Sequence, residues 1–123
     1  MNNVVLVGRL TDDPKVITTE NGKQVTSVNV GVTRNYRNAD GLYETDFIRC
    51  VLWDVIASNT SEYCHRGDVI GIKGRLQTSS YDDDKGTKHY ITEVVAERVT
   101  FLSSGKTNEE VKQKNNKKKK ADE

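Results

Sequence analysis

Residues Thr45–Trp53 alternate between two kinds of side chain, as expected of a β-strand whose faces meet different surroundings. One face would carry Phe47, Arg49, Val51 and Trp53. The other would carry Ile48, Cys50 and Leu52. An ordinary half-buried strand does not put aromatic rings beside Arg on one face while an aliphatic set lines the other. The pattern therefore predicts that the aliphatic side chains enter a core and that the rings lie on a surface.

Four more segments have the composition of strands, and turn signals separate them. The predicted strands are Asn3–Leu10, Val25–Arg34, Val69–Tyr81 and Tyr90–Phe101. The turn signals are Asp12–Pro14, Glu20–Lys23, Asn38–Gly41 and Asp82–Lys88. The first strand is apolar on both faces, so we expect it to be packed on two sides. The strand from Val69 contains Gly71 and Gly74, which are expected where a strand coils sharply.

A short helix is predicted between the third and fourth of these five strands. Asp54 can cap its first turn, the helix would run to Tyr63, and Gly67 would end it. Five strands, strong curvature and a helix at this position describe an all-β OB-fold, a five-stranded Greek-key barrel. An SH3-like barrel would lack the helix, and an immunoglobulin sandwich would need more strands.

Composition indicates a single domain. The 123 residues suffice for one core, with residues 1–102 as the β-rich domain and residues 103–123 as a disordered Lys-rich tail. No apolar run approaches the roughly 18 residues of a membrane span, and the N-terminus lacks the pattern of a signal peptide. We therefore expect a cytoplasmic protein that does not enter a membrane.

The net charge of +1 is distributed unevenly. Residues 103–123 hold seven Lys and four acids, so residues 1–102 hold twelve basic and fourteen acidic residues, a net −2. Such a domain can still bind phosphates where its basic groups cluster, but it should depend more on stacking. The run Lys117–Lys120 would either add nonspecific phosphate affinity or be a solvated part of the tail.

Two more groups combine aromatic rings with basic side chains. Arg34, Tyr36 and Arg37 stand at the entry to the Asn38–Gly41 turn. The strand from Val69 should carry Lys73, Arg75, Gln77 and Tyr81 on one face. Its opposite face should carry Ile70, Ile72, Gly74 and Leu76. Because rings stack on bases while Arg and Lys pair with phosphates, these groups predict a surface that binds single-stranded nucleic acid without reading its sequence.

The remaining candidates are expected to have structural roles. Tyr63 and Tyr90 lack basic companions and should be packing residues, and Phe101 should close the barrel. Cys50 should be a small buried hydrophobe. The run Asp82–Asp84 and the two histidines, His65 and His89, lack the spacing of a metal or catalytic site. We expect no metal, no cofactor and no enzymatic activity.

Several motifs in series resemble bacterial single-stranded-DNA-binding proteins, and they cover nearly all of residues 1–102. The motifs are Met1–Leu10 with Asp13-Pro14, Phe47–Trp53, Tyr63 with Arg66-Gly67, Gly74–Thr78 and Thr92–Ala96. The resemblance implies an OB-fold that forms a homotetramer with the help of its first strand. It also implies binding of single-stranded DNA in DNA replication, recombination and repair, and hence association with the nucleoid.

Carried over position by position, the family's stacking residues fall on Tyr36, Phe47, Trp53 and Tyr81. The predicted phosphate contacts are Arg34, Arg37, Arg49, Arg66, Lys73, Arg75, Lys85 and Lys88. Family members often have further basic residues near Ser79 and Ile17, which this chain lacks. Their main replication proteins usually end in an acidic tip that finishes in Pro-Phe and recruits partner enzymes. This chain ends in Lys117–Glu123, so we do not expect such recruitment.

Two other functions stay open at this stage. One is a primosome-type accessory or RNA-binding OB protein, although no residue here identifies a site for a 2′-hydroxyl. The other is an OB-fold nuclease that would use Asp40, Glu44 and Asp46 with a divalent metal.

Overall fold

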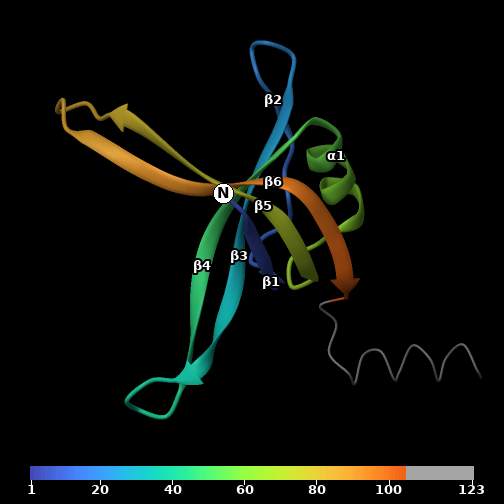
Figure 1. Cartoon of the computed structure of the whole chain (residues 1–123). Helices are drawn as coiled ribbons and strands as arrows, with labels where there is room; N and C mark the ends of the chain where they lie inside the picture. Colours follow the sequence, from blue (N-terminus) through green and yellow to red (C-terminus); the bar gives the residue numbers. More distant parts are fainter. Residues whose placement is uncertain (105–123) are drawn as a thin grey trace, which may run out of the picture.

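A computed structural model describes residues 1–104 of the chain. The predicted Lys-rich tail and the end without an acidic tip lie almost wholly outside the described residues. Figure 1 shows a small barrel with a helix on one side and two long hairpins that project from it. The elements in chain order are β1 (Val4–Leu10), β2 (Ile17–Thr18), β3 (Gln24–Arg37), β4 (Tyr43–Trp53), α1 (Asp54–Tyr63), β5 (Val69–Asp82) and β6 (Lys88–Ser103).

All five predicted strands are confirmed, and the barrel is closed. The sheet order is β1-β5-β6-β4-β3-β2, and β1 also pairs with β3 through Arg9 and Leu10. This second pairing closes β1, β5, β6, β4 and β3 into a ring, so the OB-type barrel with its helix between β4 and β5 is confirmed. The two-residue β2 was missed because it is too short to show any alternation; it pairs with β3 beyond the barrel.

Gly8 makes the closure of the barrel possible. A Cβ at this position would collide with the backbone carbonyl of Gly31 on β3 and lie 2.8 Å from a methyl group of Val30. Residue 8 must therefore be glycine if β1 is to cross so close to β3.

The core contains the aliphatic side chains that the alternation assigned to it. Its fully buried members include Leu10, Val30, Cys50, Leu52, Ile70, Ile72 and Val94. They come from β1, β3, β4, β5 and β6, so every strand of the barrel contributes to one cluster. Burial of such side chains is the main favourable term in folding, at about 1.5–3 kcal/mol each.

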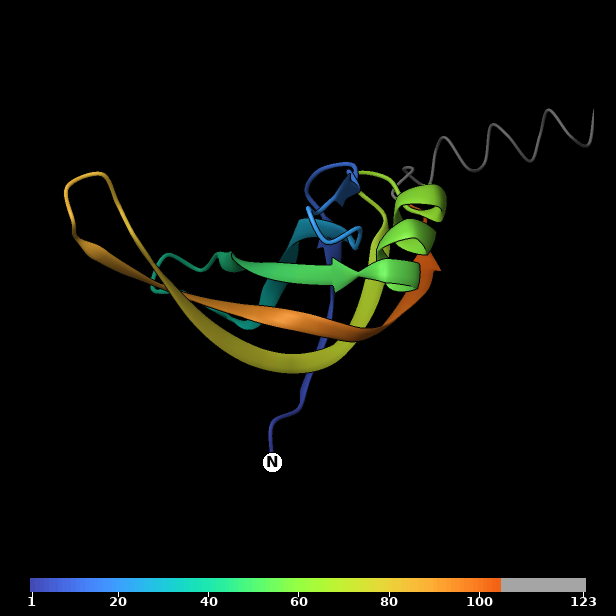
Figure 2. The ribbon, with the colours of Figure 1, turned by 90° about the horizontal axis from the view of Figure 1, so that it is seen from above.

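Two hairpins extend past the barrel (Figure 2). We call them the β3–β4 arm, with its turn at residues 38–42, and the β5–β6 arm, with its turn at residues 83–87. From Arg75 onward β5 is exposed almost throughout. Leu76, which was expected on the core face, is 47% exposed because β5 leaves the barrel just after a register shift at Lys73–Gly74.

The two arms have the same turn chemistry. The side-chain Oδ1 of Asn38 accepts the N–H groups of Asp40 and Leu42, and the Oδ1 of Asp83 accepts those of Lys85 and Thr87. Gly41 and Gly86 follow with φ values of 79° in each turn. Each arm is therefore closed by hydrogen bonds from a single Asn or Asp, as in an Asx turn.

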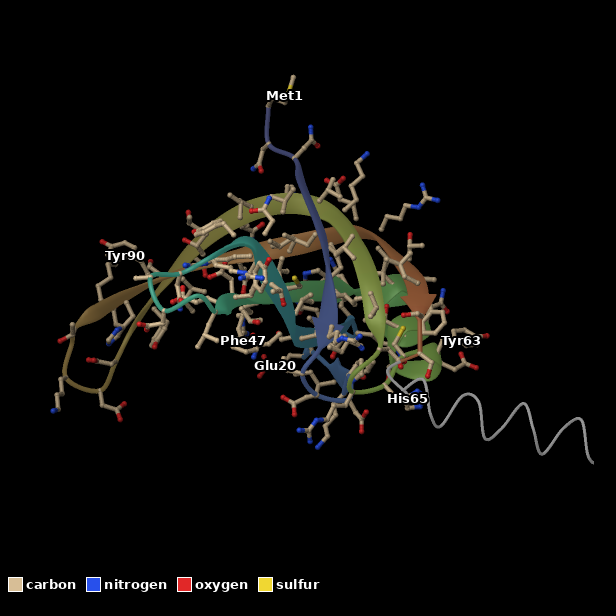
Figure 3. All side chains as sticks on the ribbon, turned by 90° about the horizontal axis from the view of Figure 1, so that it is seen from below. Met1, Glu20, Phe47, Tyr63, His65 and Tyr90 are labelled. Carbon is tan, nitrogen blue, oxygen red and sulfur yellow. The ribbon has the colours of Figure 1, made fainter. Side chains whose placement is uncertain are left out.

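Three aromatic residues that were expected to pack are instead on the surface. Tyr63 is 67% exposed, Tyr90 78% and Phe101 51%, so these predictions are wrong for the single chain. The barrel interior is filled by aliphatic side chains, while Tyr63 ends α1 and Tyr90 stands on the β5–β6 arm (Figure 3). Phe101 lies near the end of β6, where it pairs with Ile70 of β5.

The first strand is likewise packed on only one of its faces. Val4 and Leu6 contact the core, but Val5 and Val7 on the other face are 72% and 55% exposed. The expected packing on both sides is therefore absent from the single described chain.

The helix begins differently from the prediction. Trp53 occupies the N-cap position without a side-chain hydrogen bond, and Asp54 is the first residue of α1. Asp54 has a φ of +52°, so it makes the sharp change of direction from strand to helix and does not cap the helix. The helix ends at Tyr63. Gly67 lies in the turn before β5, where its N–H donates to the carbonyl of Leu10.

No helix within residues 1–104 is long and apolar enough to cross a membrane.

The left-handed backbone of Asp54 gives a prediction about stability. Asp54→Val should lower the free energy of unfolding by about 1–2 kcal/mol, because a β-branched side chain is strained at positive φ. Asp54→Gly is the matched control and should stay within about 0.5 kcal/mol of wild type, since glycine adopts this conformation freely. Urea unfolding measures both values. Equal losses in the two variants would contradict the role of backbone strain.

Candidate nucleic-acid interface

The four predicted stacking rings are all on the surface. The exposed fractions are 61% for Tyr36, 68% for Phe47, 39% for Trp53 and 53% for Tyr81. The expectation that the alternation on β4 separates rings from core is confirmed, with one exception. Val51 shares the ring face but is only 6% exposed.

Phe47 lies on the barrel itself, opposite a glycine of the neighbouring strand. Gly31 pairs with Phe47 across β3 and β4, and a Cβ at Gly31 would be 3.4 Å from the ring atom Cε1. The absence of a side chain there leaves the ring at one wall of an open groove of about 440 Å³. Val7, Arg9 and Thr33 also line this groove. An apolar ring beside a hollow is a geometry that can accept a flat base.

Trp53 stands at the end of β4, next to the β2–β3 turn. It lines a second open hollow, of about 410 Å³, together with Lys23, Asn21 and Thr19. A Lys near a partly exposed indole provides the charge that a phosphate would need. Sequence reasoning missed Lys23 because it is thirty positions away along the chain.

The predicted group of Arg34, Tyr36 and Arg37 is split between the two faces of the β3–β4 arm. The guanidinium of Arg34 contacts Asp46 with two nitrogens, Nε and Nη2, and lies 2.6 Å from Glu44. Glu44 and Asp46 alternate with Phe47 on β4, so Arg34 lies on the face opposite Phe47. The hydrogen bonds from Arg34 hold the pKa of Asp46 below its usual range, and those carboxylates raise the pKa of Arg34.

Arg37 lies on the other face of the same arm. Its guanidinium carbon is 5.4 Å from the centre of the Tyr43 ring. Tyr43 is four positions before Phe47 on β4, so the two rings share a face. Arg34, by contrast, is 6.0 Å from the ring of Tyr36. Tyr43 is 54% exposed and was missed by the sequence analysis, although its position in the period of β4 could have identified it.

On the β5–β6 arm, Tyr81 stacks on His89. The ring centres are 5.1 Å apart with 21° between the planes, and His89 Nε2 is 2.7 Å from Asp83 Oδ2. The hydrogen bond with His89 is the main cause that lowers the pKa of Asp83. Asp83 therefore organises the turn with one oxygen and holds His89 with the other. One face of Tyr81 is covered by His89.

Other predicted phosphate contacts also have protein partners. Arg49 forms an ion pair of 3.0 Å with Glu93 and a hydrogen bond with Ser27. Arg75 donates to the side chain of Gln77. Arg66 lines a hollow together with Asp12, Asp13, Lys15 and Ser27. Lys73 is in register with Val5 on one side and Arg98 on the other. Lys85 and Lys88 lie at the β5–β6 turn.

The remaining candidate side chains are Cys50 and the acids of the nuclease alternative. Burial raises the pKa of the Cys50 thiol to about 11, and Cys50 is fully buried in the core as expected. Within residues 1–104, no group of three or more His, Cys, Asp or Glu side chains is arranged to hold a metal ion. Glu44 and Asp46, which the nuclease alternative required, are both paired with Arg34.

The Arg34–Asp46 pair predicts a pH dependence of stability. A carboxylate whose folded pKa is lowered stabilises the fold at pH values above its unfolded pKa of about 3.9 and stops doing so as the pH falls through its folded pKa. The difference in melting temperature between wild type and Asp46→Asn should therefore be largest near pH 7 and shrink below about pH 4. Asp84→Asn is the control for loss of an exposed carboxylate and should melt close to wild type at pH 7. A constant difference for Asp46→Asn would contradict the prediction.

Comparisons with known proteins identify the family. Residues 1–102 match the sequence profile of the Single-strand binding protein family. The chain is 45% identical over 101 residues to "Single-stranded DNA-binding protein B" of Bacillus subtilis, covering 82% of this chain and 89% of that protein. It is 46% identical over 107 residues to "Single-stranded DNA-binding protein 1" of Lactococcus lactis, with 87% and 71% covered. The chain therefore belongs to the Single-strand binding protein family.

Proposed function

We propose that this chain binds single-stranded DNA without reading its sequence and without catalysis. Bases stack on Tyr36, Phe47, Trp53 and Tyr81, and phosphates meet the basic side chains near these rings. The observation that carries the proposal is the exposure of all four rings on a barrel whose core is otherwise filled by aliphatic side chains. Large exposed apolar groups are characteristic of binding surfaces. Membership of the family and the names of the relatives point to the same ligand.

Stacking must provide a large share of the affinity. Residues 1–102 carry a net charge of −2, and Arg34 and Arg49 are already paired with carboxylates. A phosphate would have to compete with those carboxylates. Each ring that stacks on a base contributes about 1–3 kcal/mol, and this contribution does not depend on charge.

The cellular role follows from the same binding. A protein that covers single strands without sequence preference protects them wherever duplex DNA is opened, in replication, recombination and repair. We place that role in the cytoplasm, at the nucleoid. The family membership supports these assignments.

Removal of a single ring tests the proposal. Phe47→Ala and Trp53→Ala should each weaken binding to dye-labelled oligo(dT) about 5- to 150-fold, which corresponds to one lost stacked base. Fluorescence anisotropy measures the affinity, and circular dichroism checks that the fold is kept. Tyr63→Ala is the control, because Tyr63 is as exposed as Phe47 but lies at the end of α1 (Figure 3). Wild-type affinity in both variants would refute the stacking surface.

Three further measurements on the ligand complete this test. Titration of the wild type at several salt concentrations counts the phosphates, because the slope for single strands is about −0.7 per phosphate neutralised. Competition between oligo(dT) and oligo(U) of equal length separates DNA binding from RNA binding. Incubation of labelled DNA with Mg²⁺ should give no shortened product, and cleavage would favour the nuclease alternative.

We also propose that the chain assembles as a homotetramer. Val5 and Val7 expose apolar surface on β1, and Leu102 lies beside them, 3.6 Å from the Cβ position of Gly71. Within the described residues, Val4–Gly8 pair only with β5, so the other edge of this half of β1 is unpaired. A strand with a free edge and exposed valines is suited to pairing with a second copy.

Replacement of the exposed valines tests this assembly. Light scattering coupled to size exclusion should give wild type a mass close to that of four chains. Val5→Glu with Val7→Glu should lower the mass, because two buried charges oppose the interface. Val55→Glu is the matched control, since Val55 is equally exposed but stands on α1. A monomeric wild type, or an unchanged mass in the double variant, would contradict the proposal.

A further inference from the structure

Tyr43 presents an aromatic ring at the end of the β3–β4 arm. It is the first residue of β4, 54% exposed, and the neighbouring Leu42 is 65% exposed. The register shift of this arm lies on β3, where the steps from Thr33 to Arg37 oppose only those from Thr45 to Tyr43, while β4 continues unbroken to Phe47. Tyr43 and Phe47 therefore share a face of the arm. They are four positions apart along the strand, a distance of roughly 13 Å, so the two rings would contact different bases.

The ring is held in position before any ligand binds. Asn38 fixes the turn through its Oδ1, and its backbone N–H donates to the carbonyl of Leu42 at 2.8 Å. The side chain of Asn38 also donates to Glu44, the residue after Tyr43. The exposure of Tyr43 is therefore a property of an ordered hairpin, and little conformational entropy remains to be lost when a base stacks on it.

Charge distinguishes the two faces of the arm. On one face, Arg34 is neutralised by Glu44 and Asp46. On the other, Arg37 lies over the ring of Tyr43, and among residues 1–104 it forms no ion pair. The Arg34 group therefore offers a phosphate no net positive charge, whereas the second face presents an uncompensated guanidinium.

We propose that Tyr43, steadied by Arg37, is a further base-stacking position that extends the Phe47 face along the β3–β4 arm. This inference rests on the proposed function, since it assigns one more contact with the same single-stranded DNA. Arg37 covers one side of the ring and offers its charge to the adjacent phosphate, while a base stacks on the side that remains.

Affinity measurements with three variants test the assignment. Tyr43→Ala should weaken binding to labelled oligo(dT) about 5- to 150-fold with an unchanged salt slope, because a stacked base is lost and no phosphate contact is removed. Tyr43→Phe keeps the ring and should bind within about twofold of wild type. Tyr63→Ala is the matched control for loss of an exposed tyrosine and should bind as wild type. Wild-type affinity in Tyr43→Ala overturns the inference.

A fluorescence experiment tests the contact directly. Trp53 is the only tryptophan of the chain, so Trp53→Phe combined with Tyr43→Trp puts the sole indole at the end of the arm. Addition of oligo(dT) should quench it. An unquenched indole in a variant that binds labelled oligo(dT) overturns the inference and leaves the proposed function standing. If the wild type does not bind oligo(dT), the proposed function itself fails.

Discussion

The whole arrangement depends on the closure of the barrel by β1. This strand pairs with β5 along most of its length and with β3 at Arg9 and Leu10, so it joins β5 to β3 and closes the ring of five strands. The closure requires Gly8, because any side chain there would meet the backbone of Gly31. Once the barrel is closed, the inward residues of all five strands share one core, and many outward residues, the four rings among them, are exposed among residues 1–104.

Closure also explains why the long strands become arms. β3, β4, β5 and β6 have 11 to 16 residues each, more than the barrel can use. The surplus continues as two hairpins without a core of their own. Asn38 and Asp83 order these hairpins by the same set of hydrogen bonds, which replace burial as the source of local order. Aromatic rings on such arms are both exposed and held in a defined position, the two conditions for stacking on a base without a large loss of conformational entropy.

Acidic side chains decide how positive charge is distributed near the rings. Glu44, Asp46 and Glu93 are paired with Arg34 or Arg49, so two of the cations nearest the rings are partly neutralised. Exposed ion pairs of this kind contribute little to stability. They also reduce the positive potential on one face of the β3–β4 arm and leave Arg37 uncompensated on the other.

The sequence by itself determined the barrel, the helix position, the aliphatic core and the exposure of the four rings, because a period of two assigns each strand residue to a face. It could not assign Tyr63, Tyr90 and Phe101, since their exposure depends on where α1 and β6 end relative to the core. The sequence also could not predict the left-handed backbone of Asp54. An Asp at the start of a helix is expected both as an N-cap and as a residue with positive φ, so its identity alone does not separate the two. Tertiary structure alone decided which side chains meet across the arms. The pairs Arg34–Asp46, Tyr81–His89 and Arg37–Tyr43 join residues six to twelve positions apart, and only the register of each hairpin brings them into contact.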